Sequence, residues 1–307
     1  MKTKQSRRDF LRISSAGAIG ALLLSKSDLI SASEGDRKKK ATGVGLQLYT
    51  IRDAMGKDVQ GSLKKVSDIG YKYLELASYR EGKFYGQTPE DLKKMANDLG
   101  MEIISSHAGI NPKGISDDDA KKMAEDHAKV GAKYCMQPFI GDADRKSAEG
   151  YRKMVADWNK VGKIMKDNGV KFGYHNHNFE FDTVDGKVPY FDIMLAEMDK
   201  DLLTMELDLF WAAKAGLDPV ELFNKYPGRF ELFHVKDMSK KEEPFFKTAS
   251  DDMVPVGTGV IDFKRILDAG KKAGLKYMFV EQDNAGKGDA FAAIQTSFTN
   301  LTTKILG

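Results

Sequence analysis

The chain has 307 residues, of which 41% are apolar and 30% charged, and its formal net charge is +3. This length suits one large α/β domain or two ordinary domains. Seventeen Phe and eleven Tyr supply apolar surface for a sizeable core, which excludes a disordered chain. The single cysteine, Cys135, excludes a disulfide scaffold. Charges interrupt every long apolar run except one near the N-terminus, which argues against a polytopic membrane protein.

The positive charge is concentrated at the N-terminus. Residues 1–33 contain six Lys and Arg against two Asp, a net charge of +4, which leaves −1 for the other 274 residues. The basic composition therefore gives little support to nucleic-acid binding, and we expect no nucleic-acid partner.

This N-terminal segment has the order of a secretory signal. Arg7 and Arg8 precede Phe10-Leu11, an apolar stretch covers residues 16–24, and small serines precede Glu34. The segment resembles the bacterial twin-arginine export signal. The alternative is an amphipathic surface helix, because the apolar run is too short to span a bilayer.

We therefore predict three parts. A twin-arginine signal peptide covers residues 1–33, a linker covers 34–42, and one domain covers 43–307. The protein is expected to be periplasmic or otherwise exported, without a stable membrane anchor, and its oligomeric state stays open.

Short apolar runs alternate with amphipathic stretches along the domain. Eight runs are expected to be strands: Val44–Tyr49, Tyr73–Leu76, Glu102–Ser106, Tyr134–Phe139, Val170–His175, Leu203–Leu207, Phe230–Val235 and Tyr277–Val280. Helices are expected between them, for example over Val59–Ile69, Pro89–Leu99, Asp118–Val130 and Tyr151–Asn168. Several of these helices end in Gly just before the next strand, a common stop signal.

Eight strand–helix units over about 265 residues predict a single α/β domain with the (β/α)8 TIM-barrel fold. A doubly wound open sheet is the alternative, but the first strand lacks the Gly-rich phosphate turn of that class. The least regular stretch, Asp237–Gly259, is long for a barrel loop and is expected to be a lid or substrate loop.

Polar residues gather where the strands end, which is where TIM-barrel active sites lie. Four of the five histidines occur at these ends, and only His127 falls within a predicted helix. Imidazoles and carboxylates that converge from neighbouring strands favour a divalent metal site. The mixed nitrogen and oxygen donors suit Mn, Co, Zn or Fe(II) better than Mg. The opposing interpretation is that such residues only cap helices or make hydrogen bonds.

Alternation along a strand places His175 and His177 on one side, and Glu206 and Asp208 likewise. One member of each pair is expected to bind the metal, while the other orients it or holds substrate. The choice between the two histidines stays open at this point.

The pattern resembles the xylose isomerase-like TIM-barrel superfamily, in its sugar phosphate isomerase/epimerase group. Four fragments carry the resemblance: Asp208-Leu209-Phe210-Trp211, His234-Val235-Lys236-Asp237, Pro255 to Phe263, and Val280-Glu281. The resemblance implies that Asp208, His234 and Glu281 bind the metal. The family's fourth ligand is commonly Glu at the end of strand five, where this chain has His175.

The resemblance implies an enzyme of carbohydrate metabolism that acts on a small sugar. Its expected reaction is isomerisation or epimerisation of a sugar or keto-sugar through an enediolate stabilised by a divalent metal. Because histidines replace the strand-five carboxylate, a lyase or dehydratase of keto-sugars or keto-cyclitols is the alternative. A non-catalytic periplasmic sugar-binding barrel is the third hypothesis.

The remaining site residues complete this hypothesis. Glu281, His177, Lys236 and His107 are the expected catalytic residues, with Lys236 either contacting the substrate or being only a surface charge. Substrate binding is expected from Glu75, Tyr49, Trp211, Gln137 and Glu180, with Glu75 and His107 alternatively expected to orient a metal ligand. The apurinic endonuclease branch is disfavoured, because it needs more histidines and a basic face.

Overall fold

The computed structural model describes residues 43–111, 114–184, 186–241 and 243–307. The predicted signal peptide and linker fall on residues 1–42 and lie outside the described residues. Within the described part, no helix is long and apolar enough to cross a membrane.

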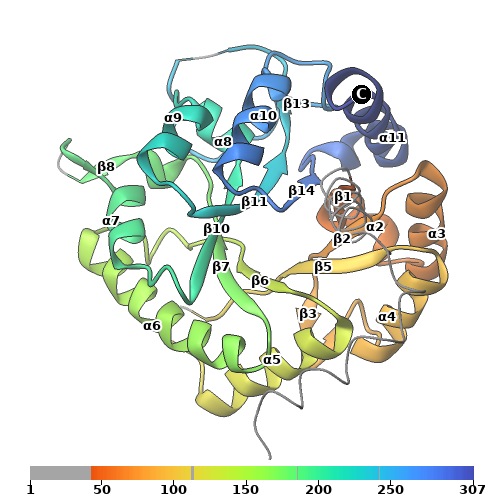
Figure 1. The fold of residues 1–307 in the computed structure, drawn as a ribbon, viewed down its shortest axis with the longest axis horizontal. Helices are drawn as coiled ribbons and strands as arrows, with labels where there is room; N and C mark the ends of the chain where they lie inside the picture. The colour runs from red at the N-terminus through yellow and green to blue at the C-terminus, as the bar shows by residue number, and fades with distance from the viewer. Residues whose placement is uncertain (1–42, 112–113, 185, 242) are drawn as a thin grey trace, which may run out of the picture. The chain divides into compact units, whose positions relative to one another are not determined.

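Eight parallel strands form a closed barrel, with helices outside it (Figure 1). Around the barrel the strands are β1 (Val44–Gln47), β2 (Tyr73–Leu76), β5 (Glu102–His107), β6 (Tyr134–Gln137), β7 (Lys171–His175), β10 (Leu203–Asp208), β11 (Phe230–Val235) and β14 (Tyr277–Val280). The pairing of β1 with β14 closes the sheet. All eight predicted strands and the TIM-barrel fold are confirmed.

The α-helices follow the strands in chain order. They are α2 (Arg52–Met55), α3 (Val59–Ile69), α4 (Pro89–Asp98), α5 (Asp117–Val130), α6 (Ala148–Asp167), α7 (Tyr190–Glu197), α8 (Leu209–Lys214), α9 (Pro219–Lys225), α10 (Phe263–Ala273) and α11 (Ala290–Asn300). Short 3-10 turns cover Leu48–Ile51, Phe179–Phe181 and Ala285–Lys287, and a π-helical turn covers Leu301–Ile305.

Several boundaries differ from the prediction for local chemical reasons. Strand β6 ends at Gln137 because Pro138 has no amide hydrogen for the ladder. Helices α5 and α6 begin earlier than expected, since the hydroxyls of Ser116 and Ser147 accept hydrogen bonds from amides three residues later. The glycine stop signals hold; Gly70, for example, has φ +117.

Three short antiparallel hairpins escaped the sequence prediction. They are β3 (Tyr79–Arg80) with β4 (Lys83–Phe84), β8 (Thr183–Val184) with β9 (Val188–Pro189), and β12 (Asp237–Met238) with β13 (Met253–Val254). Each hairpin lies in the segment of chain that follows a barrel strand. The predicted lid stretch contains the last hairpin.

Successive side chains of a strand point to opposite faces of the sheet, so the apolar residues of the barrel belong to two main clusters. Leu232 and Phe279 belong to a small cluster, and each stands two residues before His234 and Glu281 respectively, on the same side of its strand. This cluster therefore fills the barrel interior beneath the strand-end polar groups. Gly45 makes room for it, because a Cβ there would lie 2.4 Å from the Phe279 ring. The larger cluster joins strands to helices.

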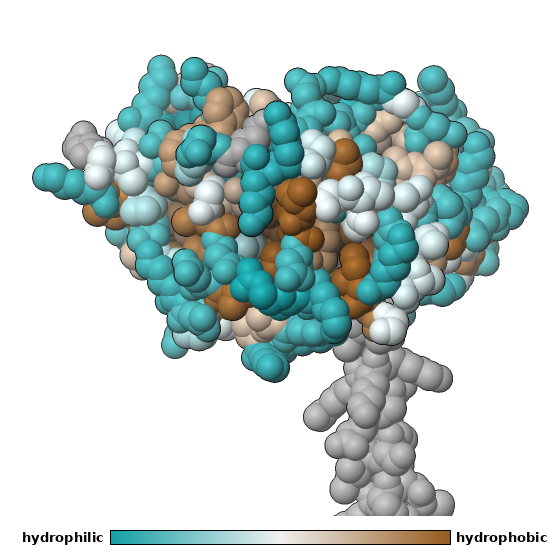
Figure 2. Space-filling model, turned by 90° about the horizontal axis from the view of Figure 1, so that it is seen from above, coloured by the Kyte–Doolittle hydropathy of each residue, from teal (hydrophilic) through white to brown (hydrophobic). Residues whose placement is uncertain are grey.

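The outer surface is mixed in character. The face drawn in Figure 2 is largely hydrophilic, with apolar side chains visible between charged ones. Such a distribution is ordinary for a folded domain.

Candidate metal centre and active site

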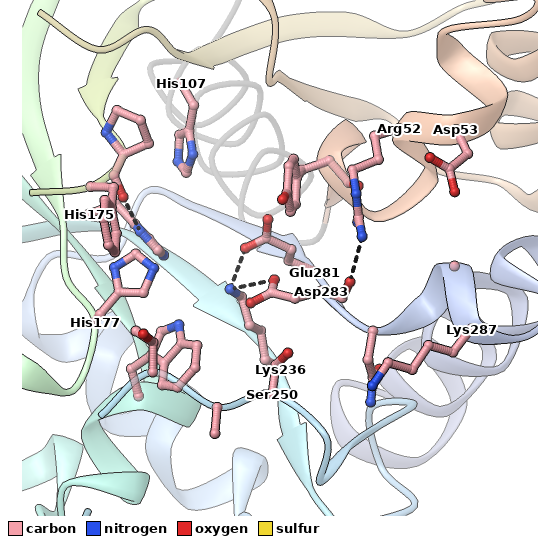
Figure 3. Close-up of a pocket in the computed structure, with 18 residues that line it drawn as sticks. Arg52, Asp53, His107, His175, His177, Lys236, Ser250, Glu281, Asp283 and Lys287 are labelled. Carbon is pink, nitrogen blue, oxygen red and sulfur yellow. Dashed lines mark hydrogen bonds and ion pairs between the residues drawn. The ribbon is translucent and has the colours of Figure 1, made fainter. Parts of the chain in front are cut away.

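The strand-end residues converge on one cavity of 720 Å³ (Figure 3). Its lining includes Tyr49, Arg52, Asp53, His107, Phe139, His175, His177, Trp211, Thr248, Ala249, Ser250, Lys236, Glu281, Asp283, Asn284 and Lys287. The cavity is thus built from the segments that follow several barrel strands, where the sequence places the chemistry.

Four buried side chains from β7, β10, β11 and the end of β14 form a compact donor set. One potential ligand atom each from His175, Asp208, His234 and Glu281 lies within 4.8 Å of the others. His175 Nε2 lies 3.1 Å from Asp208 Oδ2, and His234 Nδ1 lies 2.8 Å from Glu281 Oε2. These are the four residues predicted as metal ligands.

The donor set fits a divalent ion. His234 Nδ1 and Glu281 Oε2 are buried and face each other at 2.8 Å, and the Lys236 ammonium is the other charged neighbour of Glu281 Oε2. Ligand atoms about 2.1 Å from a tetrahedral ion lie about 3.4 Å apart. The spacings of 2.8 Å, 3.1 Å and 3.7 Å among these atoms bracket that value. A cation between them would be bound by both atoms.

A second layer of carboxylates lies beneath the donor set. Glu75 Oε2 lies 2.5 Å from His234 Nε2 and accepts a 2.8 Å hydrogen bond from Gln47 Nε2. This contact occupies Nε2 of His234 and leaves Nδ1 for a metal. His107 Nε2 lies 2.8 Å from Glu206 Oε2. The ring of His107 also stacks on that of His234, with centroids 5.1 Å apart.

These contacts bear on the role of Glu75. The side chain was expected either to bind substrate or to orient a metal ligand; it is fully buried and is not among the residues that line the cavity. Its position supports His234. His107, in contrast, lines the cavity as expected.

Gln137 and Glu180 also lie outside the cavity lining, although both were predicted to bind substrate. Gln137 Oε1 accepts from Ile110 N at 2.7 Å, and its Nε2 donates to Phe139 O. Glu180 accepts from the Tyr174 hydroxyl and from His177 N. Burial raises the pKa of Glu180 to about 8. Both residues therefore fix the loops that carry the site.

His177, Trp211 and Tyr49 line the cavity as predicted. His177 Nδ1 and Trp211 Nε1 are buried without hydrogen-bond partners. Burial, together with the neighbouring His175 and Lys236, lowers the pKa of His177 well below its usual value. A neutral imidazole and an indole N–H are therefore free to meet a ligand.

Lys236 is buried rather than a surface charge. Its Nζ lies 2.5 Å from Glu281 Oε2, 3.0 Å from Asp283 Oδ1 and 3.1 Å from Asp208 Oδ2 (Figure 3). Burial opposes its charge, but these three carboxylates outweigh burial and raise its pKa well above the usual value. The side chain is an ammonium ion that faces the donor set.

Several lining residues escaped the sequence analysis. Arg52, Asp53, Asn284 and Lys287 lie in loops or short helices, where no periodic pattern marks them, and Phe139 lies just beyond the end of β6. Asp283 could have been found, because it stands two residues after Glu281 at the end of the same strand. Thr248 to Ser250 belong to the predicted lid stretch.

The glycine-containing motif before α10 has a structural role. Asp237 Oδ2 accepts from the amides of Gly257 and Gly259, and its Oδ1 accepts from Met238 N and, at 3.3 Å, from Ile261 N. One buried carboxylate therefore organises the turn after β13. A Cβ at Gly259 would lie 2.4 Å from Asp237 Oδ1, so only Gly fits there.

A single parallel eight-stranded barrel with a metal-ligand set at its strand ends defines the class of the molecule. The chain belongs to the xylose isomerase-like TIM barrel family, whose model matches residues 63–299.

The chain is similar to proteins named as dehydratases and to proteins named as isomerases or epimerases. An inosose dehydratase of Geobacillus kaustophilus (strain HTA426) is 25% identical over 230 residues, which cover 66% of this chain and 72% of the relative. An inosose dehydratase of Clostridium beijerinckii (strain ATCC 51743 / NCIMB 8052) is 31% identical over 147 residues, or 43% of this chain and 48% of the relative. A solved sugar phosphate isomerase/epimerase from Parabacteroides distasonis ATCC 8503 is 28% identical, with a TM-score of 0.75, and covers 86% of this chain and 95% of that chain.

Proposed function

We propose that this protein is a divalent-metal-dependent lyase that removes water from a keto-cyclitol or keto-sugar. The observation that carries the proposal is the pairing of a neutral imidazole, His177, with a charged ammonium, Lys236, in the cavity that holds the donor set. Elimination needs both a base and an acid. The similarity to inosose dehydratases supports the same reaction class.

The donor set supplies the electrophile. A divalent ion held by His175, Asp208, His234 and Glu281 would act as a Lewis acid on the substrate carbonyl and make the adjacent C–H bond more acidic. The donor types favour Mn, Co, Zn or Fe(II) over Mg.

His177 then takes the proton from the carbon next to the carbonyl. Its depressed pKa keeps the ring neutral near pH 7, so the ring can accept a proton there. Glu180 holds the backbone of His177 through a 2.9 Å hydrogen bond to its amide. The base is therefore fixed relative to β7.

Lys236 protonates the group that leaves. As the carbon–oxygen bond at the β-carbon breaks, the departing hydroxyl takes the bonding electron pair and a proton from Nζ, and leaves as water. The electron pair of the broken C–H bond forms the new carbon–carbon double bond. Glu281 and Asp283 hold Nζ in place at 2.5 Å and 3.0 Å.

Proton NMR in heavy water tests this proposal. The metal-loaded protein, incubated with an inosose and with simple keto-sugars, is expected to give an unsaturated ketone. His177→Gln should lower kcat by about 10²- to 10⁴-fold. Intact substrate with no exchange at the adjacent carbon would contradict the proposal.

Isomerisation or epimerisation is the second candidate function. It is favoured by the 28% identity to the Parabacteroides distasonis structure. This reaction returns a proton to the substrate and loses no water. Deuterium found in an isomer, without an unsaturated product, would identify it.

We also propose that residues 1–33 direct export by the twin-arginine route. The proposal rests on Arg7-Arg8 and the apolar stretch behind them. Changing both arginines to lysine should retain the protein in the cytoplasm. Normal periplasmic recovery of that variant would contradict export by this route.

A further inference from the structure

Two cavities share one wall beside the metal centre. The active-site cavity and a second cavity of 920 Å³ are both lined by Tyr49 and Arg52. The second cavity lies against the β3–β4 hairpin and the residues that begin α3. It contains none of the four residues of the donor set.

The shared wall is the partly exposed aromatic ring of Tyr49, which Arg52 contacts. Tyr49 is 42% exposed. The guanidinium of Arg52 lies 4.3 Å from the centre of its ring. Arg52 donates to Tyr49 O at 2.9 Å and to Asp283 O at 3.0 Å, which ties the pair to the segment after β14 (Figure 3). A ligand that occupied both cavities would lie beside Tyr49, which lines both, and the apolar face of its ring suits the C–H face of a sugar ring.

The second cavity has the lining of a site for neutral hydroxyl groups. It mixes four cations, Arg52 among them, with the carboxylates of Asp58 and Glu81, two amides and the Ser78 hydroxyl. A ligand group with a full positive or negative charge would lie near a side chain of the same charge in this cavity. Hydroxyl groups both donate and accept, so they match this mixture.

A tight turn shapes the hairpin that forms the far wall. Glu81 and Gly82 link its two strands with φ +53 and +80, as in a type I′ hairpin turn, and Tyr85 just after the hairpin has φ +51. The Tyr85 hydroxyl accepts a 2.7 Å hydrogen bond from Ala77 N, which holds the segment.

We propose that the substrate has two rings: a keto ring that reacts at the metal centre, joined to a second, neutral polyhydroxylated ring that crosses Tyr49 and lies in the second cavity. The inference rests on the proposed function for the first ring. It assigns the second cavity as a binding site for a sugar unit that does not react. Binding energy from this unit would position the reacting ring.

Filling the second cavity tests the inference without touching the metal centre. Ser78→Trp places a large side chain in it, and Ser78→Ala is the matched control. The wild type should turn over a keto-cyclitol carrying a glycosidic second ring with a kcat/KM about tenfold higher than the free keto-cyclitol. Ser78→Trp should abolish that preference, Ser78→Ala should keep it, and turnover of the free ring should be unchanged in both.

The outcomes separate this inference from the proposed function. Equal kcat/KM for the two substrates in the wild type overturns the two-ring inference and leaves the function standing, as does an equal loss on both substrates in Ser78→Trp. If neither substrate reacts, the function fails, and calorimetric titration with the same two compounds then decides. Tighter binding of the two-ring compound that Ser78→Trp removes supports the inference; equal affinities overturn it.

Discussion

The two ends of the barrel differ in how completely their polar side chains are paired. At the N-terminal end, Glu231 on β11 contacts Lys171 at 2.8 Å and Lys276 at 2.9 Å, and accepts from the Tyr134 hydroxyl at 2.8 Å. Burial opposes its charge, but these partners outweigh burial and lower its pKa. At the C-terminal end, two cavity-lining atoms, His177 Nδ1 and Trp211 Nε1, are buried without hydrogen-bond partners beside the donor set.

This difference separates a stabilising cluster from a binding one. Charged groups that already have partners stabilise the strands and need no ligand. Buried polar atoms without a partner can still form a hydrogen bond or bind a ligand. In TIM barrels the C-terminal end carries the chemistry and the N-terminal end contributes stability. Four predictions test this division.

Removing the donor set should have the largest effect. The double variant Asp208→Ala/His234→Ala should purify without stoichiometric metal and lose activity by at least about 10³-fold, since two of four ligands are gone. Metal analysis by mass spectrometry checks the first claim. Retention of one metal per chain would sink the assignment.

The layer beneath the donor set should matter less. Glu75→Gln removes the charge beside His234 Nε2 and should weaken metal affinity by about 10- to 100-fold. Competition with a chelator measures that affinity. An unchanged affinity would mean that Glu75 does not support the ligand.

The N-terminal cluster should affect stability alone. Glu231→Gln should lower the free energy of unfolding by about 2 kcal/mol, because Glu231 is the shared partner of two lysines and a tyrosine. Metal content and kcat should equal those of the wild type. A loss of metal from Glu231→Gln would contradict the claim that only the C-terminal end of the barrel binds it.

A histidine away from both ends should give the smallest effect. Burial lowers the pKa of His127 to about 4, while the unfolded chain takes up a proton near 6.5. Stability should therefore fall between pH 6.5 and pH 4, by about 1.4 kcal/mol at pH 5.5.

The variant His127→Gln supplies the control. It should show a smaller loss of stability between pH 7.5 and pH 5.5 than the wild type in urea unfolding. Identical pH dependence in the two proteins would refute the assignment of this slope to His127.

Sequence pattern predicted the barrel well because its strands are buried apolar runs bounded by glycine and cap residues. It missed the β3–β4 hairpin, whose exposed residues Arg80 and Lys83 carry no apolar alternation. It placed His175, Asp208, His234 and Glu281 at strand ends. There, the alternation of side chains between the two faces and the parallel pairing of the strands determine where each side chain lies.

Residues in loops resisted the same reasoning. Glu180 stands near the end of β7 in sequence, but the turn over Phe179–Phe181 carries it into a buried contact with Tyr174. Arg52 and Lys287 reach the cavity from opposite ends of the chain. Their positions depend on tertiary packing that no local pattern encodes.

Anomalous diffraction from crystals soaked in Mn, Co or Zn tests the central claim most directly. The account predicts one strong peak per chain, about 2.0–2.3 Å from ligand atoms of His175, Asp208, His234 and Glu281. The structure offers a second group of buried donors: Glu75, His107, Glu206 and His234. A peak centred on that group, or no ordered metal at all, would contradict the account.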